Sequence, residues 1–177
     1  LPTLPDAALD DRLARVEVRT ERSLQALRLT EITLGHAVES VEQWRTRQGA
    51  VPRKWPVRGV LTSGFGWRRS PFTRRWKFHS GLDLSAPKGT AVHAPAPGVV
   101  RTAQMTSGYG RLVEIDHGFG IMTRFGHNSR VFVEVGDLVK VGQVISTVGM
   151  TDQTTGPHLH YEVHVDGQPV DPLEYLE

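Results

Sequence analysis

Hydrophobic residues in the first 48 positions follow a helical repeat. They recur in alternating steps of four and three, a heptad pattern that polar residues interrupt near its middle. The positions are Leu9, Leu13, Val16, Thr20, Ser23, Leu27, Thr30, Leu34, Ala37, Val41 and Trp44. This spacing predicts a helix over residues 7–47, capped by Asp6 and about 60 Å long at ~1.5 Å per residue. We expect its apolar seam to pair with a second copy, to belong to a longer coiled coil, or to pack along its own domain.

The pattern changes at Gly49. Pro52 and Pro56 predict an extended linker over residues 49–56. Beyond it, short apolar runs alternate with glycine and proline, which predicts short strands. The predicted strands span residues 60–62, 90–93, 98–102, 111–116, 121–125, 130–133, 138–139, 144–148 and 160–165.

These changes in sequence pattern predict three parts: an N-terminal coiled-coil-like helix (1–48), the linker (49–56) and a mainly β domain (57–177). Strands so short favour an antiparallel two-sheet sandwich or partly open barrel. Residues 69–78 carry several basic side chains and are expected to form an irregular loop.

The amino-acid composition limits the class of protein and the residues that could bind a metal. Of 177 residues, 38% are hydrophobic and 23% are charged, as in a soluble globular protein. Cysteine is absent, so any metal must be held by His, Asp or Glu. No apolar run approaches the ~20 residues that span a bilayer. Because the chain begins at Leu1 and not at Met, we expect a mature or trimmed form, and whether a leader or an anchor has been lost stays open.

Charge is unevenly distributed although the net charge is only +2. No Asp or Glu occurs from Gln43 to Leu82, where ten Lys and Arg residues fall. Such a run would attract an anionic polymer, either nucleic acid or an acidic cell-wall polymer, or would simply be a solvated surface. The interleaved aromatic pattern of a nucleic-acid-binding module is missing, so a nucleic-acid partner is not expected.

The most informative stretch is residues 155–164, TGPHLHYEVH. Read as a strand, it places His158, His160, Glu162 and His164 on one face and apolar residues on the other. Adjacent neutral imidazoles on a rigid strand can hold a divalent metal, or hold it and act beside it. The competing explanation is that an HxH sequence occurs by chance on a polar strand face.

A second cluster, His79 and Asp83, lies some eighty residues earlier, on a path from a loop into a strand. Two histidines and one carboxylate from these clusters would make a three-ligand site with an open fourth position, the pattern of a catalytic zinc.

Two further segments, residues 92–100 and 135–145, resemble the half-motifs of biotinyl- and lipoyl-type carrier domains. A carrier needs a lysine at a tight hairpin tip, and this chain has none there. The likeness therefore indicates a related barrel-sandwich fold and not a carrier function.

Residues from about 57 to 176 resemble the LytM/lysostaphin-type zinc metallopeptidases of the bacterial cell envelope. The matching segments occur in the same order and at the same spacing as in that family. They span residues 63–68, 79–83, 94–100, 116–118, 126–127, 136–142, 155–162 and 170–172. The resemblance implies a LytM-like β fold for about two-thirds of the chain.

Carried over by position, the resemblance implies that His79, Asp83 and His160 bind one Zn²⁺ per chain. It also implies that His158 and His127 are the two catalytic histidines. We expect His158 to be the base that takes a proton from water, and His127 to stabilise the oxyanion or protonate the leaving amine.

Three other polar residues near these clusters have expected positions as well. Glu162 is expected either to orient a metal ligand or to pair with nearby arginines. His164 is expected towards the rim of the groove, because it lies about 7 Å further along the strand than His160. His117 is expected to order a turn.

The implied function is a zinc endopeptidase that hydrolyses peptide bonds in peptidoglycan cross-links or stem peptides. The alternative is a non-catalytic, peptidoglycan-binding activator of another cell-wall hydrolase. Either would work in the bacterial cell envelope, periplasmic or extracellular, with an anchor in a segment missing from this chain left open. Through its helix the chain would form a homodimer or meet a partner in the membrane or the division machinery.

Overall fold

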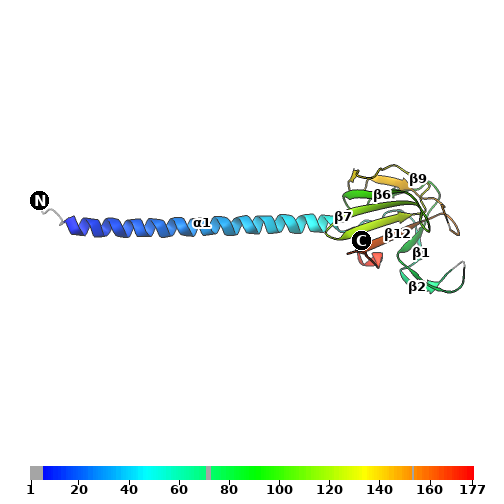
Figure 1. Ribbon diagram of the computed structural model, residues 1–177, viewed down its shortest axis with the longest axis horizontal. Coiled ribbons are helices and arrows are strands. Elements are labelled where there is room, and N and C mark those ends of the chain that lie inside the picture. The colour runs from blue at the N-terminus through cyan, green and yellow to red at the C-terminus, as the bar shows by residue number, and fades with distance from the viewer. Residues whose placement is uncertain (1–5, 71–72, 153) are drawn as a thin grey trace. The chain divides into compact units, whose positions relative to one another are not determined.

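The computed structural model describes residues 6–70, 73–152 and 154–177 (Figure 1). The chain forms two compact units that divide between Arg45 and Thr46. Helix α1 (Asp6–Ala50) is 45 residues long and runs three residues past the predicted end. Gly49 and Ala50 can both continue a helix, and the chain leaves helical geometry only as Pro52 approaches.

The heptad seam of α1 is largely exposed within this chain. Leu13, Val16, Leu27 and Leu34 each remain more than half exposed. The polar seam residues Thr20, Ser23 and Thr30 donate their hydroxyls to the carbonyls four residues earlier, at distances of 2.5, 2.9 and 2.8 Å. These four apolar seam residues thus stay largely exposed in the described part of the chain.

Short strands make up the rest of the chain. They are β1 (Val60–Ser63), β2 (Gly66–Arg69), β3 (Trp76–His79), β4 (Leu82–Ser85), β5 (Ala91–His93), β6 (Gly98–Thr106), β7 (Gly110–Gly118), β8 (Ile121–Gly126), β9 (Arg130–Val131), β10 (Leu138–Val139), β11 (Val144–Thr147), β12 (His158–Val165) and β13 (Gln168–Val170). A 3₁₀ helix follows at Pro172–Glu174.

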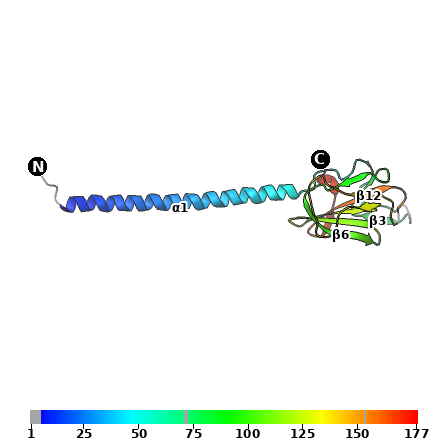
Figure 2. The same ribbon diagram turned by 90° about the horizontal axis from the view of Figure 1, so that it is seen from above.

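Three antiparallel sheets form from these strands. The largest has the order β1-β4-β12-β8-β7-β6-β10, with β13 added to β12. A second sheet has the order β5-β11-β9, and β2 and β3 form a separate pair. Figure 2 shows β3, β6 and β12 within this domain after a quarter turn. The expected fold class, mainly β with antiparallel sheets, no closed barrel among the described strands and one long N-terminal helix, is confirmed.

The expected loop at residues 69–78 was wrong for Arg69 and residues 76–78, which lie in strands, whereas Ser70 and residues 73–75 lie outside any strand as expected. Strands β2 and β3 form a hairpin in which Trp67 pairs with Phe78 and Arg69 with Trp76. The Trp67 and Phe78 rings meet edge to face, with centroids 5.8 Å apart. The sequence pattern missed this hairpin because its strands are only four residues long and most of their side chains are exposed. Residues 71 and 72 lie outside the described part.

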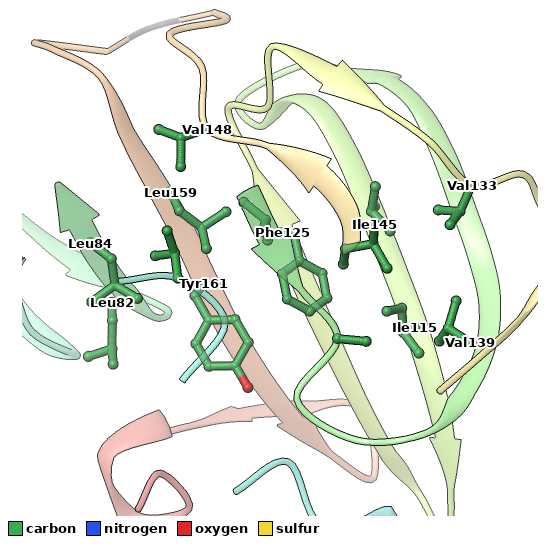
Figure 3. Close-up of a cluster of buried hydrophobic side chains, with 14 of the residues drawn as sticks. Leu82, Leu84, Ile115, Phe125, Val133, Val139, Ile145, Val148, Leu159 and Tyr161 are labelled. Carbon is green, nitrogen blue, oxygen red and sulfur yellow. The ribbon is translucent and has the colours of Figure 1, made fainter. Parts of the chain in front are cut away.

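The hydrophobic core lies beneath the centre of the large sheet (Figure 3). Leu82 and Leu84 of β4 and Leu159 and Tyr161 of β12 point into it, and all four are fully buried. Burying a side chain of this size contributes about 1.5–3 kcal/mol. Side chains alternate along a strand, so the neighbours of these core residues point to the opposite face of the sheet. These neighbours are Asp83, His158, His160 and Glu162.

Candidate metal centre

Strand register brings the two sequence clusters together. In the β4–β12 ladder His160 lies directly opposite Asp83. On the other edge of β12, His160 lies opposite Gly126, the residue before His127. His79 ends β3, four residues before Asp83. The antiparallel pairing therefore gathers residues that are some eighty positions apart in the sequence.

Three side-chain atoms converge at this point. His79 Nε2 lies 3.1 Å from Asp83 Oδ1, and His160 Nδ1 lies 2.9 Å from the same oxygen. The two nitrogens are 3.2 Å apart. Ligands of a tetrahedral zinc at ~2.0 Å would be separated by about 3.3 Å, so the three atoms already stand near a zinc-binding arrangement. His79, Asp83 and His160 are the group of described residues that could hold a metal ion.

Each of these three side chains also contacts a neighbouring group on the side away from the centre. His79 donates Nδ1–H to the Gly64 carbonyl at 2.7 Å, which leaves Nε2 free to ligate. Arg68 donates to Asp83 Oδ2 at 3.1 Å, so the other carboxylate oxygen faces the centre. His160 uses Nε2 to contact Glu162 Oε1 at 2.9 Å, so that Nδ1 faces the centre. Such outer contacts orient metal ligands and set the tautomer of each imidazole.

The charges of this cluster are tightly linked. Burial alone would raise the pKa of Asp83, but its contacts with His160 and His79 outweigh burial and hold the pKa well below its usual range. Burial alone would lower the pKa of His160, whereas its contacts with Asp83 and Glu162 raise that pKa to about 9. The metal-free site therefore keeps a proton on His160 at neutral pH, and a metal ion would have to displace it.

His158 and His127 stand beside the three possible ligands. His158 donates Nδ1–H to the Gly156 carbonyl at 2.8 Å, and His127 donates Nδ1–H to the Thr151 carbonyl at 2.9 Å. The centroids of their rings are 4.8 Å apart. In both neutral rings the lone pair is therefore on Nε2. Nε2 of His158 is 3.7 Å from Asp83 Oδ1, which places this atom next to the possible metal site.

The backbone and the charge state of His127 are both unusual. Its φ of 62° lies in the left-handed region, where a residue with a side chain is strained. Burial lowers the pKa of His127 to about 4, despite the opposing effect of its hydrogen bond to Thr151. His127 is thus held neutral at physiological pH.

All five residues expected from the sequence line one groove, namely His79, Asp83, His127, His158 and His160. Arg68, Lys77 and Tyr109 line it as well, and sequence reasoning assigned none of them a role. Arg68 had a usable signal, because it ends the matching segment 63–68. Tyr109 had none, since it sits in the turn between β6 and β7.

Expectations for the remaining polar residues had mixed outcomes. Glu162 makes both expected contacts, with His160 and, at 3.6 Å, with Arg124. The placement of His164 at the groove rim was wrong. It is buried, and its Nε2 lies 2.6 Å from Glu162 Oε2. His117 is buried and bonded to the Pro97 carbonyl and the Thr123 hydroxyl, which is a structural role.

The chain matches the model of peptidase family M23 over residues 77–172, which is more than half of its length. It therefore belongs to this family, and the resemblance to the LytM/lysostaphin-type peptidases is confirmed. A zinc containing peptidase from Vibrio cholerae has a similar solved structure. It is 37% identical, with a TM-score of 0.63 over 67% of this chain and 38% of that one.

Two curated relatives differ in what their names describe. The DD-carboxypeptidase/endopeptidase Mpg of Neisseria meningitidis serogroup B is 43% identical over 64% of this chain and 26% of its own length. The murein hydrolase activator EnvC of Escherichia coli is 34% identical over 94% of this chain and 40% of its own length. This chain thus spans about a quarter of the first relative and less than half of the second.

Among the residues that the structure describes, no helix has both the length and the apolar character required to cross a membrane.

Proposed function

We propose that this chain is a zinc-dependent endopeptidase that hydrolyses peptide bonds in peptidoglycan cross-links or stem peptides. One observation carries the proposal: three possible ligand atoms stand about 3 Å from one another, with two further imidazoles beside them. Membership of peptidase family M23 and the names of the Neisseria and Vibrio relatives support it.

His79 Nε2, Asp83 Oδ1 and His160 Nδ1 would hold the zinc. Two imidazoles and one carboxylate are ligands that zinc prefers, and three protein ligands leave a position for water or substrate. When bound, the ion would supply Lewis acidity to the scissile carbonyl and lower the pKa of its water. No cysteine competes for it in the chain.

His158 is the proposed general base. Its Nδ1–H is engaged by Gly156, so the Nε2 lone pair faces the groove and can accept a proton from water. The same nitrogen can return that proton to the leaving amine. The Gly156 carbonyl holds the ring in the required tautomer, the usual function of a third group behind a base.

His127 is proposed to stabilise the oxyanion, which requires a proton on its Nε2. In its neutral form His127 also presents a lone pair at Nε2, because Thr151 accepts its Nδ1–H. It can donate a hydrogen bond into the groove only while Nε2 is protonated. Since burial keeps its pKa near 4, the neutral ring prevails at physiological pH, and the oxyanion role would rest on the small fraction of His127 that carries a proton on Nε2.

A second candidate function is activation of another cell-wall hydrolase without catalysis. The similarity to EnvC favours it, because that match covers 94% of this chain. The complete set of metal-site residues favours the enzyme. Incubating the purified chain alone with purified peptidoglycan separates the two: new amino groups that disappear with a chelator support the peptidase, and none would support the activator.

We further propose that α1 pairs with a second copy of the chain. Its seam residues are exposed and spaced as in a two-stranded coiled coil. A single helix of this length, with leucines and valines in water on its surface, gains stability by burying them.

A further inference from the structure

We propose that Glu162 is a positioning residue that fixes His160 as a metal ligand; this rests on the proposed function. Glu162 lies two residues after His160 on the same face of β12, and it is fully buried. A carboxylate is costly to bury unless every lone pair is matched. The hydrogen-bond donors around the Glu162 carboxylate indicate its role.

Donors surround this carboxylate from four parts of the fold. Oε1 accepts from His160 Nε2 at 2.9 Å, from the Tyr109 hydroxyl at 3.0 Å and from the Ser80 hydroxyl. Oε2 accepts from His164 Nε2 at 2.6 Å and lies 3.6 Å from an Arg124 nitrogen. The carboxylate therefore links β12 to β8, to the β6–β7 turn and to the loop between His79 and Asp83.

The contact with His160 decides which ring nitrogen faces the groove. While Nε2 donates its hydrogen to Glu162, the lone pair available to a metal is on Nδ1, the nitrogen beside His79 and Asp83. Among the described residues, Glu162 is the group that accepts from Nε2, so removing its carboxylate would remove the contact that holds the ring in this orientation. Glu162 thus sets both the tautomer and the orientation of His160.

A second glutamate on the same sheet, Glu114, makes fewer contacts than Glu162 and provides a comparison. Glu114 is paired with Arg124 Nε at 2.6 Å and accepts from Thr102, and no metal-site residue contacts it. The Glu114 carboxylate is thus matched by one arginine and one hydroxyl. Glu162 instead directs Oε1 towards His160 and two groups that border the groove.

Close packing around Glu162 supports the same role. A Cβ at Gly81 would stand 2.8 Å from Glu162 Cγ and 2.2 Å from the Tyr161 carbonyl oxygen. Only glycine allows the loop that carries Ser80 to reach Oε1. The segment between His79 and Asp83 is thereby tied to the same carboxylate that orients His160.

The test compares Glu162→Gln with the matched variant Glu114→Gln. The amide of Glu162→Gln has nearly the same volume but lacks the charge, so zinc should bind about 10- to 100-fold more weakly. Glu114→Gln should bind zinc within about threefold of wild type, because its carboxylate touches no ligand. The zinc dissociation constant is measured by competition with a chromophoric chelator, and thermal unfolding of the metal-free chains reports folding. A folded Glu162→Gln chain with wild-type zinc affinity would overturn the proposal.

A spectroscopic readout covers the case in which Glu162→Gln does not fold. In ¹⁵N-labelled wild-type chain without metal, His160 should show a slowly exchanging, downfield Nε2–H signal, because that hydrogen is donated to a buried carboxylate. Absence of the signal would refute the role of Glu162. Its presence in a chain that binds no zinc would instead refute the proposed zinc peptidase and leave the Glu162–His160 contact established.

Discussion

Asp83 and His160 lie opposite each other in the β4–β12 ladder, with Oδ1 of the first 2.9 Å from Nδ1 of the second. Seventy-six residues separate them in the chain, so neither local spacing nor a turn creates the contact. It follows from register, which the buried leucines of the two strands fix from below. A slip of β12 by one residue would turn His160 into the core and separate it from Asp83.

Replacing His158 should separate metal binding from turnover. His158→Ala removes the proposed base but none of the three ligands. The variant should keep its zinc and lose activity on peptidoglycan by about 10²- to 10⁴-fold. Zinc content and amino-group release are measured on the same sample, with His36→Ala on the exposed helix as control. Loss of zinc in His158→Ala would mean that this residue is a ligand.

Zinc affinity should depend on pH because of His160. Its pKa in the folded, metal-free chain is about 9, above the ordinary value of 6.5. The proton therefore stabilises the metal-free fold fully below about pH 6.5, and this contribution is lost as pH rises towards about 9. Zinc must displace the same proton, so apparent affinity should rise about tenfold per pH unit in this window. Competition titrations from pH 7 to 9 that gave a constant affinity would contradict this.

Gly81 should tolerate no side chain. The Cβ of Gly81→Ala would clash with the backbone of β12, which cannot move without disturbing the core. The expected loss is about 1–3 kcal/mol in the free energy of unfolding, measured by urea denaturation. Gly64→Ala is the control, since nothing lies within 4 Å of its Cβ position. Equal stability of the two variants would show that the loop is not held against Glu162.

Pairing through α1 should depend on the seam. Leu27→Asp and Leu34→Asp place charges at seam positions, and Leu29→Asp places one at an equally exposed position off the seam. In sedimentation equilibrium, the wild-type chain and Leu29→Asp should dimerise with similar affinity. The seam variants should dimerise at least about tenfold more weakly. A wild-type chain that stayed monomeric at all concentrations would refute the pairing.

How far the fold could be predicted depended on the kind of strand. The inward residues of β12, Leu159, Tyr161 and Val163, alternate with polar ones, so period two was visible and the face that carries His158 and His160 followed. The β2–β3 hairpin was missed because its four-residue strands are mostly exposed, and because the Trp67–Phe78 ring contact joins residues eleven positions apart on two different strands.

The site could be predicted in its residues but not in its supporting contacts. All five expected side chains line one groove. Nothing in the sequence indicated that His164 turns inward to Glu162, because distance along a strand does not reveal a buried partner. Arg68 belongs to a segment that matches the family, but its contact with Asp83 depends on the β2–β3 hairpin, which the sequence pattern did not predict.

Zinc content is the most direct test of the central claim that His79, Asp83 and His160 form a catalytic zinc site. It is measured by mass spectrometry on wild-type and Asp83→Ala chains, purified without added metal and assayed on peptidoglycan. The account predicts about one zinc per wild-type chain with release of new amino groups, and loss of both in Asp83→Ala, because two imidazoles alone hold the ion poorly. An Asp83→Ala chain that kept stoichiometric zinc and full activity would contradict it.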